Sequence, residues 1–241
     1  MRTSEPPPRS WRDELERAER FVESRLNAED VLRVLAVEAG DRFDVRPPAF
    51  VVGVETVQAE RPLRHDADEY RRVDLERIEL EASGYDVILC CNVLEHVPRP
   101  LAVLPLLRDG LRTGGLMVIM VPNVFSLKGV LTRLTPLAVH RWYYRRIVGP
   151  GSGGEPARSV HSFSLRPASL RKYARKEGLK IEYWRVYEGE VQRSFRHRLG
   201  VVGWRWRLVV TLTQVLSFGS ITAEGTGLIA ILSKVAVSES V

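Results

Sequence analysis

The chain has little cysteine and no long hydrophobic run. Only two of its 241 residues are cysteines, the neighbours Cys90 and Cys91, and adjacent cysteines supply neither a disulfide framework nor a four-ligand zinc site. No segment holds about 20 uninterrupted apolar residues, and the first residues lack the apolar stretch of a secretory signal. We therefore expect no spanning helix, no secretion, and a reducing, cytoplasmic compartment.

Acidic residues become scarce in the second half of the chain. Residues 1–130 hold 18 Lys and Arg against 23 Asp and Glu, a net charge of −5, whereas residues 131–241 hold 18 against 7, a net charge of +11. This asymmetry indicates either an anionic partner, such as a phosphate, an acidic glycan or a membrane surface, or a solvated basic face. Nucleic acid is not favoured, because no RNA-binding motif is recognisable.

Short apolar runs alternate with helical patterns along the chain. The predicted buried strands are 31–37, 49–55, 85–93, 116–122, 179–187 and 225–234. Helices are predicted after Ser10, from about Arg99 to Leu111, and from Pro167 to Gly178. The connection from 38 to 48 is too short and too rich in proline for a normal crossover helix. The alternation predicts an α/β fold with a doubly wound, mostly parallel sheet and helical additions.

Polar residues follow several of these strands. Sheets of this kind bind ligands at the carboxyl ends of their strands, and Glu55, Asp74 and Asn92 stand at or just after such ends. A carboxylate at the position of Glu55 can accept hydrogen bonds from the two hydroxyls of a ribose. The structural alternatives are a solvated acid at position 55 and local capping by Asn92, Glu95 and His96.

The stretch from Tyr85 to Asn123 resembles the second half of the class I S-adenosylmethionine-dependent methyltransferase domain. In that family an aspartate follows an aromatic residue before the fourth strand, Leu-Glu-His opens the next helix, and a Gly-Gly turn precedes a fifth strand that ends in Pro-Asn. The matching residues here are Asp86, Leu94, Glu95, His96, Gly114, Gly115, Pro122 and Asn123. The similarity extends more loosely from Val31 to about Lys180.

The resemblance implies S-adenosylmethionine as cofactor and gives roles to particular residues. Glu55 takes the ribose-binding position and Asp74 the position that flanks adenine, with Asn92 and Glu95 beside the cofactor. His96 then faces the methyl donor and is a candidate base for the acceptor.

The glycine-rich loop departs from the family pattern. The family expects an acidic residue and then G-x-G-x-G after the first strand, because glycines let backbone amides approach the cofactor. Here Ala36 stands at the acidic place, Glu38 at the first glycine, and Gly40 alone survives. Two interpretations follow: a compact variant that still binds cofactor, which we favour because Glu55 and the Leu-Glu-His turn are intact, and a scaffold that has lost binding.

The acceptor side is expected in the second half of the chain. Aromatic and arginine residues interleave around His140, Tyr143 and Arg145, a pattern that fits sugars, nucleotides or phosphates, or a cap that packs its own rings. His161 resembles a histidine found before the sixth strand in methyltransferases of glycan and lipid biosynthesis. The resemblance implies a second candidate catalytic residue that lines the acceptor pocket, and the alternative is a residue that caps a turn. Segment 193–218 combines arginines and tryptophans with apolar residues, as in an interfacial helix, although core or dimer packing explains it equally well.

These observations predict a single domain over 1–241, with an N-terminal helix at 1–27, a cofactor-binding half at 28–134 and an acceptor-side cap with C-terminal strands at 135–241. The expected activity is methylation of a hydroxyl of a sugar, a glycolipid or a small metabolite, on a small-molecule, glycan or lipid-linked acceptor. Peripheral contact with the inner membrane face is an alternative location.

The competing function is a non-catalytic scaffold that binds an anionic partner. A nicotinamide-dependent oxidoreductase is disfavoured, because no G-x-G-x-x-G follows the first strand.

Overall fold

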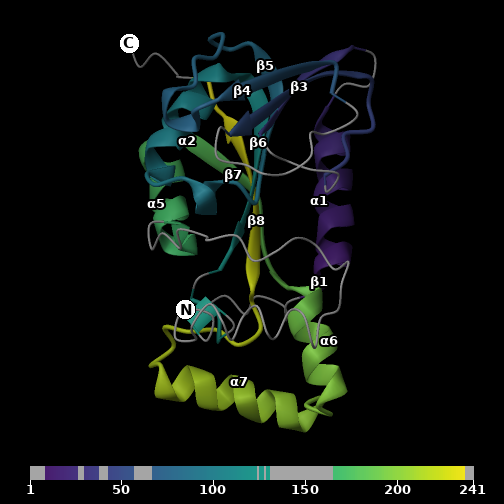
Figure 1. Cartoon of the computed structure of the whole chain (residues 1–241), viewed down its shortest axis with the longest axis vertical. Coiled ribbons are helices and arrows are strands. Elements are labelled where there is room, and N and C mark those ends of the chain that lie inside the picture. The colour runs from purple at the N-terminus through teal and green to yellow at the C-terminus, as the bar shows by residue number, and fades with distance from the viewer. Residues whose placement is uncertain are drawn as a thin grey trace.

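The protein is built on one eight-stranded sheet (Figure 1). A computed structural model describes residues 9–26, 30–37, 43–56, 67–123, 125–127, 129–130 and 165–236. The strands are β1 (Arg9–Ser10), β2 (Leu32–Val37), β3 (Ala49–Thr56), β4 (Glu69–Val73), β5 (Tyr85–Cys91), β6 (Leu111–Pro122), β7 (Leu179–Glu188) and β8 (Gly227–Lys234). Their order across the sheet is β1-β7-β8-β6-β5-β2-β3-β4.

The sheet is parallel except for β8, which runs antiparallel to both its neighbours, β6 and β7. The predicted doubly wound, mostly parallel α/β architecture is therefore confirmed. The sequence did not show that the last strand would insert between β6 and β7 in the reverse direction. As a result, the carboxyl ends of β2, β3, β4, β5, β6 and β7 all lie at the same edge of the sheet.

Helices cover both faces of this sheet (Figure 1). The helical segments are α1 (Trp11–Arg25), η2 (Leu75–Arg77), η3 (Leu94–His96), α2 (Pro100–Gly110), α5 (Pro167–Lys176), α6 (Glu190–Arg198) and α7 (Trp204–Leu216). Helices α2 and α5 lie on one face and α1 on the other, and each face has its own buried apolar cluster. Ser10 caps α1 as predicted, since its Oγ accepts from the backbone N–H of Asp13 at 3.3 Å. No helix among the described residues is both long and apolar enough to cross a membrane.

Helix α1 and the segment before β3 together cover the face beside β2. The described part of that connection, residues 43–48, contains no helix, as its proline content predicts. Phe43 is fully buried in the same cluster as Ala18 and Val22 of α1. The segment is tied to α1 because Glu19 accepts from the backbone N–H of Asp44 at 3.0 Å. On this face of the sheet, α1 and Phe43 supply the buried apolar surface, and Val45 packs against the same cluster.

Asp86 has a structural position at the opposite, amino-terminal edge of the sheet. Its carboxylate accepts from the backbone N–H of Arg33 at 2.6 Å and pairs with the Arg112 guanidinium at 2.5 Å. Gly115 packs against the same strand, and a Cβ there would lie 2.9 Å from the Asp86 carbonyl oxygen. The predicted Gly-Gly turn lies inside β6, at an irregularity in its pairing with β5, and Gly115 lets the two strands approach closely. Strand β6 begins at Leu111, earlier than predicted, because Leu111 already pairs with Tyr85.

A buried ion pair fixes α6 to the end of β7. Glu188 is buried and receives two hydrogen bonds from the Arg196 guanidinium, at 2.7 and 2.9 Å. Gln192 of α6 donates to the carbonyl oxygen of Ala223 at 2.7 Å. The excursion between β7 and β8 is therefore attached to the sheet by polar contacts at its base. Glu224 lies in the same environment, and burial, followed by repulsion from Glu188 and opposed by Arg196, raises its pKa above the ordinary 4.5.

This raised pKa gives stability a predictable dependence on pH. The folded chain holds the Glu224 proton more tightly than the unfolded chain, so the associated stability is present below pH 4.5 and is lost as pH rises through the folded pKa. We expect Glu224→Gln to unfold at a higher urea concentration than the wild type near neutral pH. The difference should vanish at pH 4, and a difference of equal size at both pH values would contradict the assignment.

Candidate active site

Strand β2 ends between two strands that carry polar residues. Val37, its last residue, pairs with Val54 of β3 on one side and with Cys90 of β5 on the other. Neighbouring strands lie about 4.8 Å apart, so the backbones of β3 and β5 are roughly 10 Å apart across the end of β2. The switch in strand order lies here, where such sheets bind ligands.

Glu55 stands on the β3 side of this position. It is one residue beyond the partner of Val37 and pairs in register with Arg72 of β4. Its side chain is half-buried. Position 55 therefore lies at the carboxyl end of the strand next to β2, and its predicted contact with a ribose stays a prediction.

Asn92 begins the turn on the β5 side. Its backbone has a φ of 54°, in the left-handed region that asparagine tolerates better than most residues. Its backbone N–H donates to the carbonyl oxygen of Met120 at 2.8 Å. The chain thus leaves β5 abruptly, and this backbone requirement explains an asparagine here without any ligand.

Glu95 and His96 follow within the short helix η3. Glu95 is buried and His96 is half-buried, and the His96 backbone N–H donates to the carbonyl oxygen of Val93 at 2.9 Å. The turn therefore places a carboxyl and an imidazole just beyond β5, at the same edge as Glu55. Glu55 and the 92–96 turn thus lie at the same edge of the sheet, as the strand order requires.

Asp74 has a local capping role. Its Oδ1 accepts from the backbone N–H of Glu76 at 3.0 Å, which starts η2 directly after β4. This local hydrogen bond accounts for an acidic residue at position 74 without any ligand. The predicted contact with adenine at this position is untested.

A clamp between Glu76 and Arg99 lies near these residues, and nothing in the sequence indicated it. The Glu76 carboxylate accepts from the backbone N–H of Arg99 at 2.8 Å and from its guanidinium at 2.6 and 3.0 Å. These hydrogen bonds lower the pKa of Glu76. The clamp joins the segment after β4 to the residue before α2, beside the predicted site. Its partners are 23 residues apart, and no local pattern connects them.

The remaining predicted site residues lie outside the described residues. They are Gly40, His140, Tyr143, Arg145 and His161. Their cofactor and acceptor roles stay predictions.

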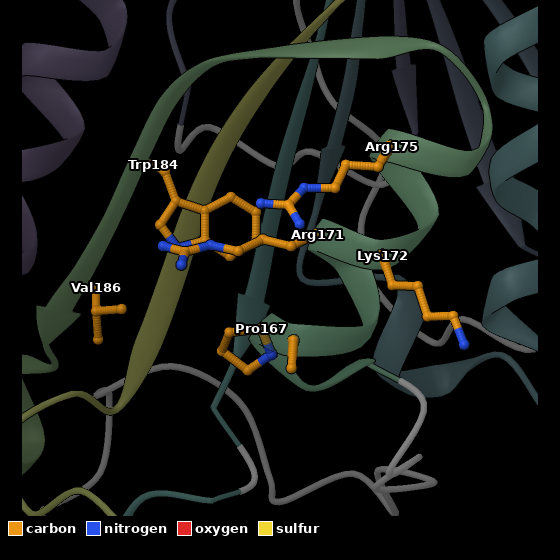
Figure 2. Close-up of a pocket in the computed structure, with 7 residues that line it drawn as sticks. Pro167, Arg171, Lys172, Arg175, Trp184 and Val186 are labelled. Atoms are coloured by element: carbon orange, nitrogen blue, oxygen red, sulfur yellow. The ribbon is translucent and has the colours of Figure 1, made fainter. Parts of the chain in front are cut away.

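A cavity of about 520 Å³ opens elsewhere, between α5 and β7. Its wall includes Trp184, and the Arg171 guanidinium lies 4.6 Å from the centre of that ring. Figure 2 shows Arg171 and Arg175 extending from α5 toward Trp184, while Lys172 points away. Strands β8, β6 and β5 separate β7 from β2, so this basic cavity is distinct from the predicted cofactor site.

The left-handed backbone at Asn92 yields a test of what this residue supplies. We expect Asn92→Ala to lower the free energy of unfolding by about 1 kcal/mol, because alanine adopts this conformation at a cost. Asn92→Gly should stay within about 0.5 kcal/mol of the wild type, since glycine adopts it freely. Urea unfolding gives the free energy of unfolding of both variants. If glycine is as costly as alanine, side-chain contacts and not backbone conformation determine the residue here.

Comparison with known proteins shows the family to which this fold belongs. Residues 13–184 match the family model described as "Methyltransferase domain". A Ubiquinone biosynthesis O-methyltransferase from Bordetella avium (strain 197N) is 30% identical over 112 residues, which cover 43% of this chain and 44% of that protein. The chain thus matches less than half the length of this curated relative.

Solved structures show the same fold at low sequence identity. An S-adenosylmethionine-dependent methyltransferase from Mesorhizobium loti has a TM-score of 0.52 at 14% identity, covering 91% of this chain and 100% of that one. A SAM-dependent methyltransferase from Methanosarcina mazei has a TM-score of 0.53 at 14% identity, covering 89% and 97%. The resemblance seen in the sequence is confirmed: the chain belongs to the methyltransferase domain family, with the fold of its class I S-adenosylmethionine-dependent members.

Proposed function

We propose that this protein transfers a methyl group from S-adenosylmethionine to a hydroxyl oxygen of a small metabolite. The observation that carries the proposal is the position of Glu55 and the 92–96 turn on either side of the end of β2. Membership of the methyltransferase family supports the reaction class.

The residues at this edge fit the cofactor by their chemistry. A half-buried carboxylate at position 55 can accept hydrogen bonds from two neighbouring hydroxyls. The 92–96 turn lies on the other side of the end of β2. The Glu76–Arg99 clamp joins the segment after β4 to the residue before α2. When bound, S-adenosylmethionine supplies an activated methyl group on a sulfonium. The protein then has mainly to align donor and acceptor and to remove a proton.

His96 is the proposed base. An imidazole accepts protons near neutral pH, and a half-buried one just beyond β5 lies where an acceptor would approach the cofactor. The hydroxyl proton would pass to an imidazole nitrogen as the oxygen takes the methyl group. Glu95, buried one residue earlier in the same turn, adds a carboxyl beside this position.

The relatives favour a small metabolite as acceptor. The curated matches are named as O-methyltransferases of ubiquinone biosynthesis, which supports oxygen as the methylated atom. Sugars and glycolipids, the other acceptors considered from the sequence, have no support among these relatives. His140, Tyr143, Arg145 and His161 are retained as proposed acceptor-side residues.

Cofactor binding is tested first, by titration calorimetry with S-adenosylhomocysteine. We expect Glu55→Gln to weaken binding by about 10- to 100-fold, since charge-assisted hydrogen bonds to the ribose are lost. Glu81→Gln is the matched control, because Glu81 lies at the amino-terminal edge in an exposed ion pair with Arg33. Absence of heat with the wild-type protein would favour the non-catalytic scaffold. Equal affinity in the two variants would remove Glu55 from the site.

Proton removal is tested by methyl transfer from labelled S-adenosylmethionine to phenols, sugars and glycolipids. We expect His96→Asn to lower kcat by about 100-fold or more and to flatten its dependence on pH, because a general base contributes roughly that factor. Its affinity for S-adenosylhomocysteine should equal that of the wild type. An unchanged kcat would exclude His96 as the base, and activity on sugars alone would overturn the proposed acceptor class.

A further inference from the structure

Exposed apolar side chains gather in one stretch of the chain. Among the described residues, nine of the thirteen large hydrophobic side chains that are exposed fall between residues 195 and 218. The most exposed are Trp204 at 70%, Leu216 at 78% and Phe218 at 96%. Scattered exposed apolar residues need no explanation, but a concentration of this kind marks an interaction surface.

Four of these nine side chains form one face of helix α7. Trp204, Leu208, Leu212 and Val215 recur at intervals of four, four and three residues, so they line the same side of the helix, and all four are exposed. No residue of α7 is buried. Trp206, Val209 and Thr213, on the opposite side, are half-buried. The helix therefore turns its most apolar face away from the protein.

Positive charge borders this face at the first turn of α7. From 191 to 223 the sequence contains five arginines and no acidic residue. Arg205 and Arg207 are exposed in the first turn of α7. An apolar helix face with arginines and a tryptophan at its border is the composition of helices that lie in the interface of an anionic membrane.

The helix is held in place at its base. Arg196, which pairs with buried Glu188, also places its guanidinium 4.9 Å from the centre of the Trp206 ring. The indole on the inner side of α7 is thus stacked on a residue anchored to the sheet. Figure 1 shows α7 lying across one end of the molecule, beyond α6. The apolar face is consequently presented by an attached element of the fold.

We infer that α7 docks this protein on anionic lipid bilayers, with its exposed apolar face among the headgroups and its arginines on the lipid phosphates. A second copy of the chain is a poorer occupant, because a two-fold contact would bring the same arginine-rich segments together. Spanning is excluded for α7, since 13 residues of helix extend only about 20 Å.

The location of α7 gives this docking a direction. The excursion at 189–226 leaves the carboxyl end of β7 and returns at Gly227, which pairs with Pro122 at the carboxyl end of β6. The bilayer would therefore lie on the side of the sheet where the parallel strands end. This inference does not depend on the proposed methyl transfer.

Vesicle sedimentation without cofactor or acceptor tests the inference. The full chain is mixed with vesicles of phosphatidylcholine alone or with phosphatidylglycerol added, at about 0.01 M and about 1 M salt. We expect binding to the anionic vesicles at low salt only. Leu208→Gln/Leu212→Gln should weaken it by at least about tenfold, from lost apolar burial. Arg205→Gln/Arg207→Gln should weaken it by about 25-fold, at roughly fivefold for each arginine.

Matched control variants show whether a loss of vesicle binding is specific to changes on α7. Val31→Gln/Val235→Gln changes two exposed apolar residues elsewhere, and Lys172→Gln/Lys176→Gln removes two exposed charges from α5; both should bind as the wild type does. Equal binding to neutral vesicles, or equal losses in variants and controls, would overturn the inference. So would a dimer that Leu208→Gln/Leu212→Gln converts to monomer without any vesicle binding, which would make a second copy the occupant.

Discussion

The parallel pairing of β2 with β3 on one side and β5 on the other is the constraint on which the site depends. It brings Glu55 and the 92–96 turn to the two sides of one strand end, although they are about forty residues apart in the sequence. The left-handed backbone of Asn92 turns the chain sharply at that point. A shift of one residue in either register would exchange the two faces of the strand and disrupt the packing of both buried clusters. The core thus holds the site geometry in place.

Two residues help to cover the sheet beside β2, where the described part of the connection to β3, residues 43–48, contains no helix. Phe43 fills the cluster on the α1 face, and Glu19 ties the following segment to α1. Burial raises the pKa of Glu19, with the Asp44 hydrogen bond acting against that rise. The N-terminal helix is therefore part of the structure that supports the end of β2. The family fold is retained because apolar area is buried from another part of the chain.

Local patterns predicted most of the fold, because they depend on short-range chemistry. The apolar run at 85–91 is fully buried as β5, Ser10 caps α1, and Gly178 follows α5 with a φ of 66°. Glu55 could be selected because strand ends are visible in sequence, whereas His96 was selected through the family resemblance, and the roles of both stay predictions. The insertion of β8 in reverse, the Glu76–Arg99 clamp and the outward face of α7 depend on long-range contacts. Segment 193–218 left core packing and an exposed interfacial helix equally open, and the exposure of α7 excludes burial in its own core.

The proposed site lies at the carboxyl end of β2 and holds the adenosyl group against the carboxylate at position 55. A crystal structure of the protein with S-adenosylhomocysteine measures this directly. We expect the ribose hydroxyls to lie within hydrogen-bonding distance of the Glu55 carboxylate, about 2.5–3.0 Å. The sulfur of S-adenosylhomocysteine should lie on the side of the 92–96 turn. Cofactor bound between α5 and β7, or a Glu55 side chain directed away from the ribose, would contradict it.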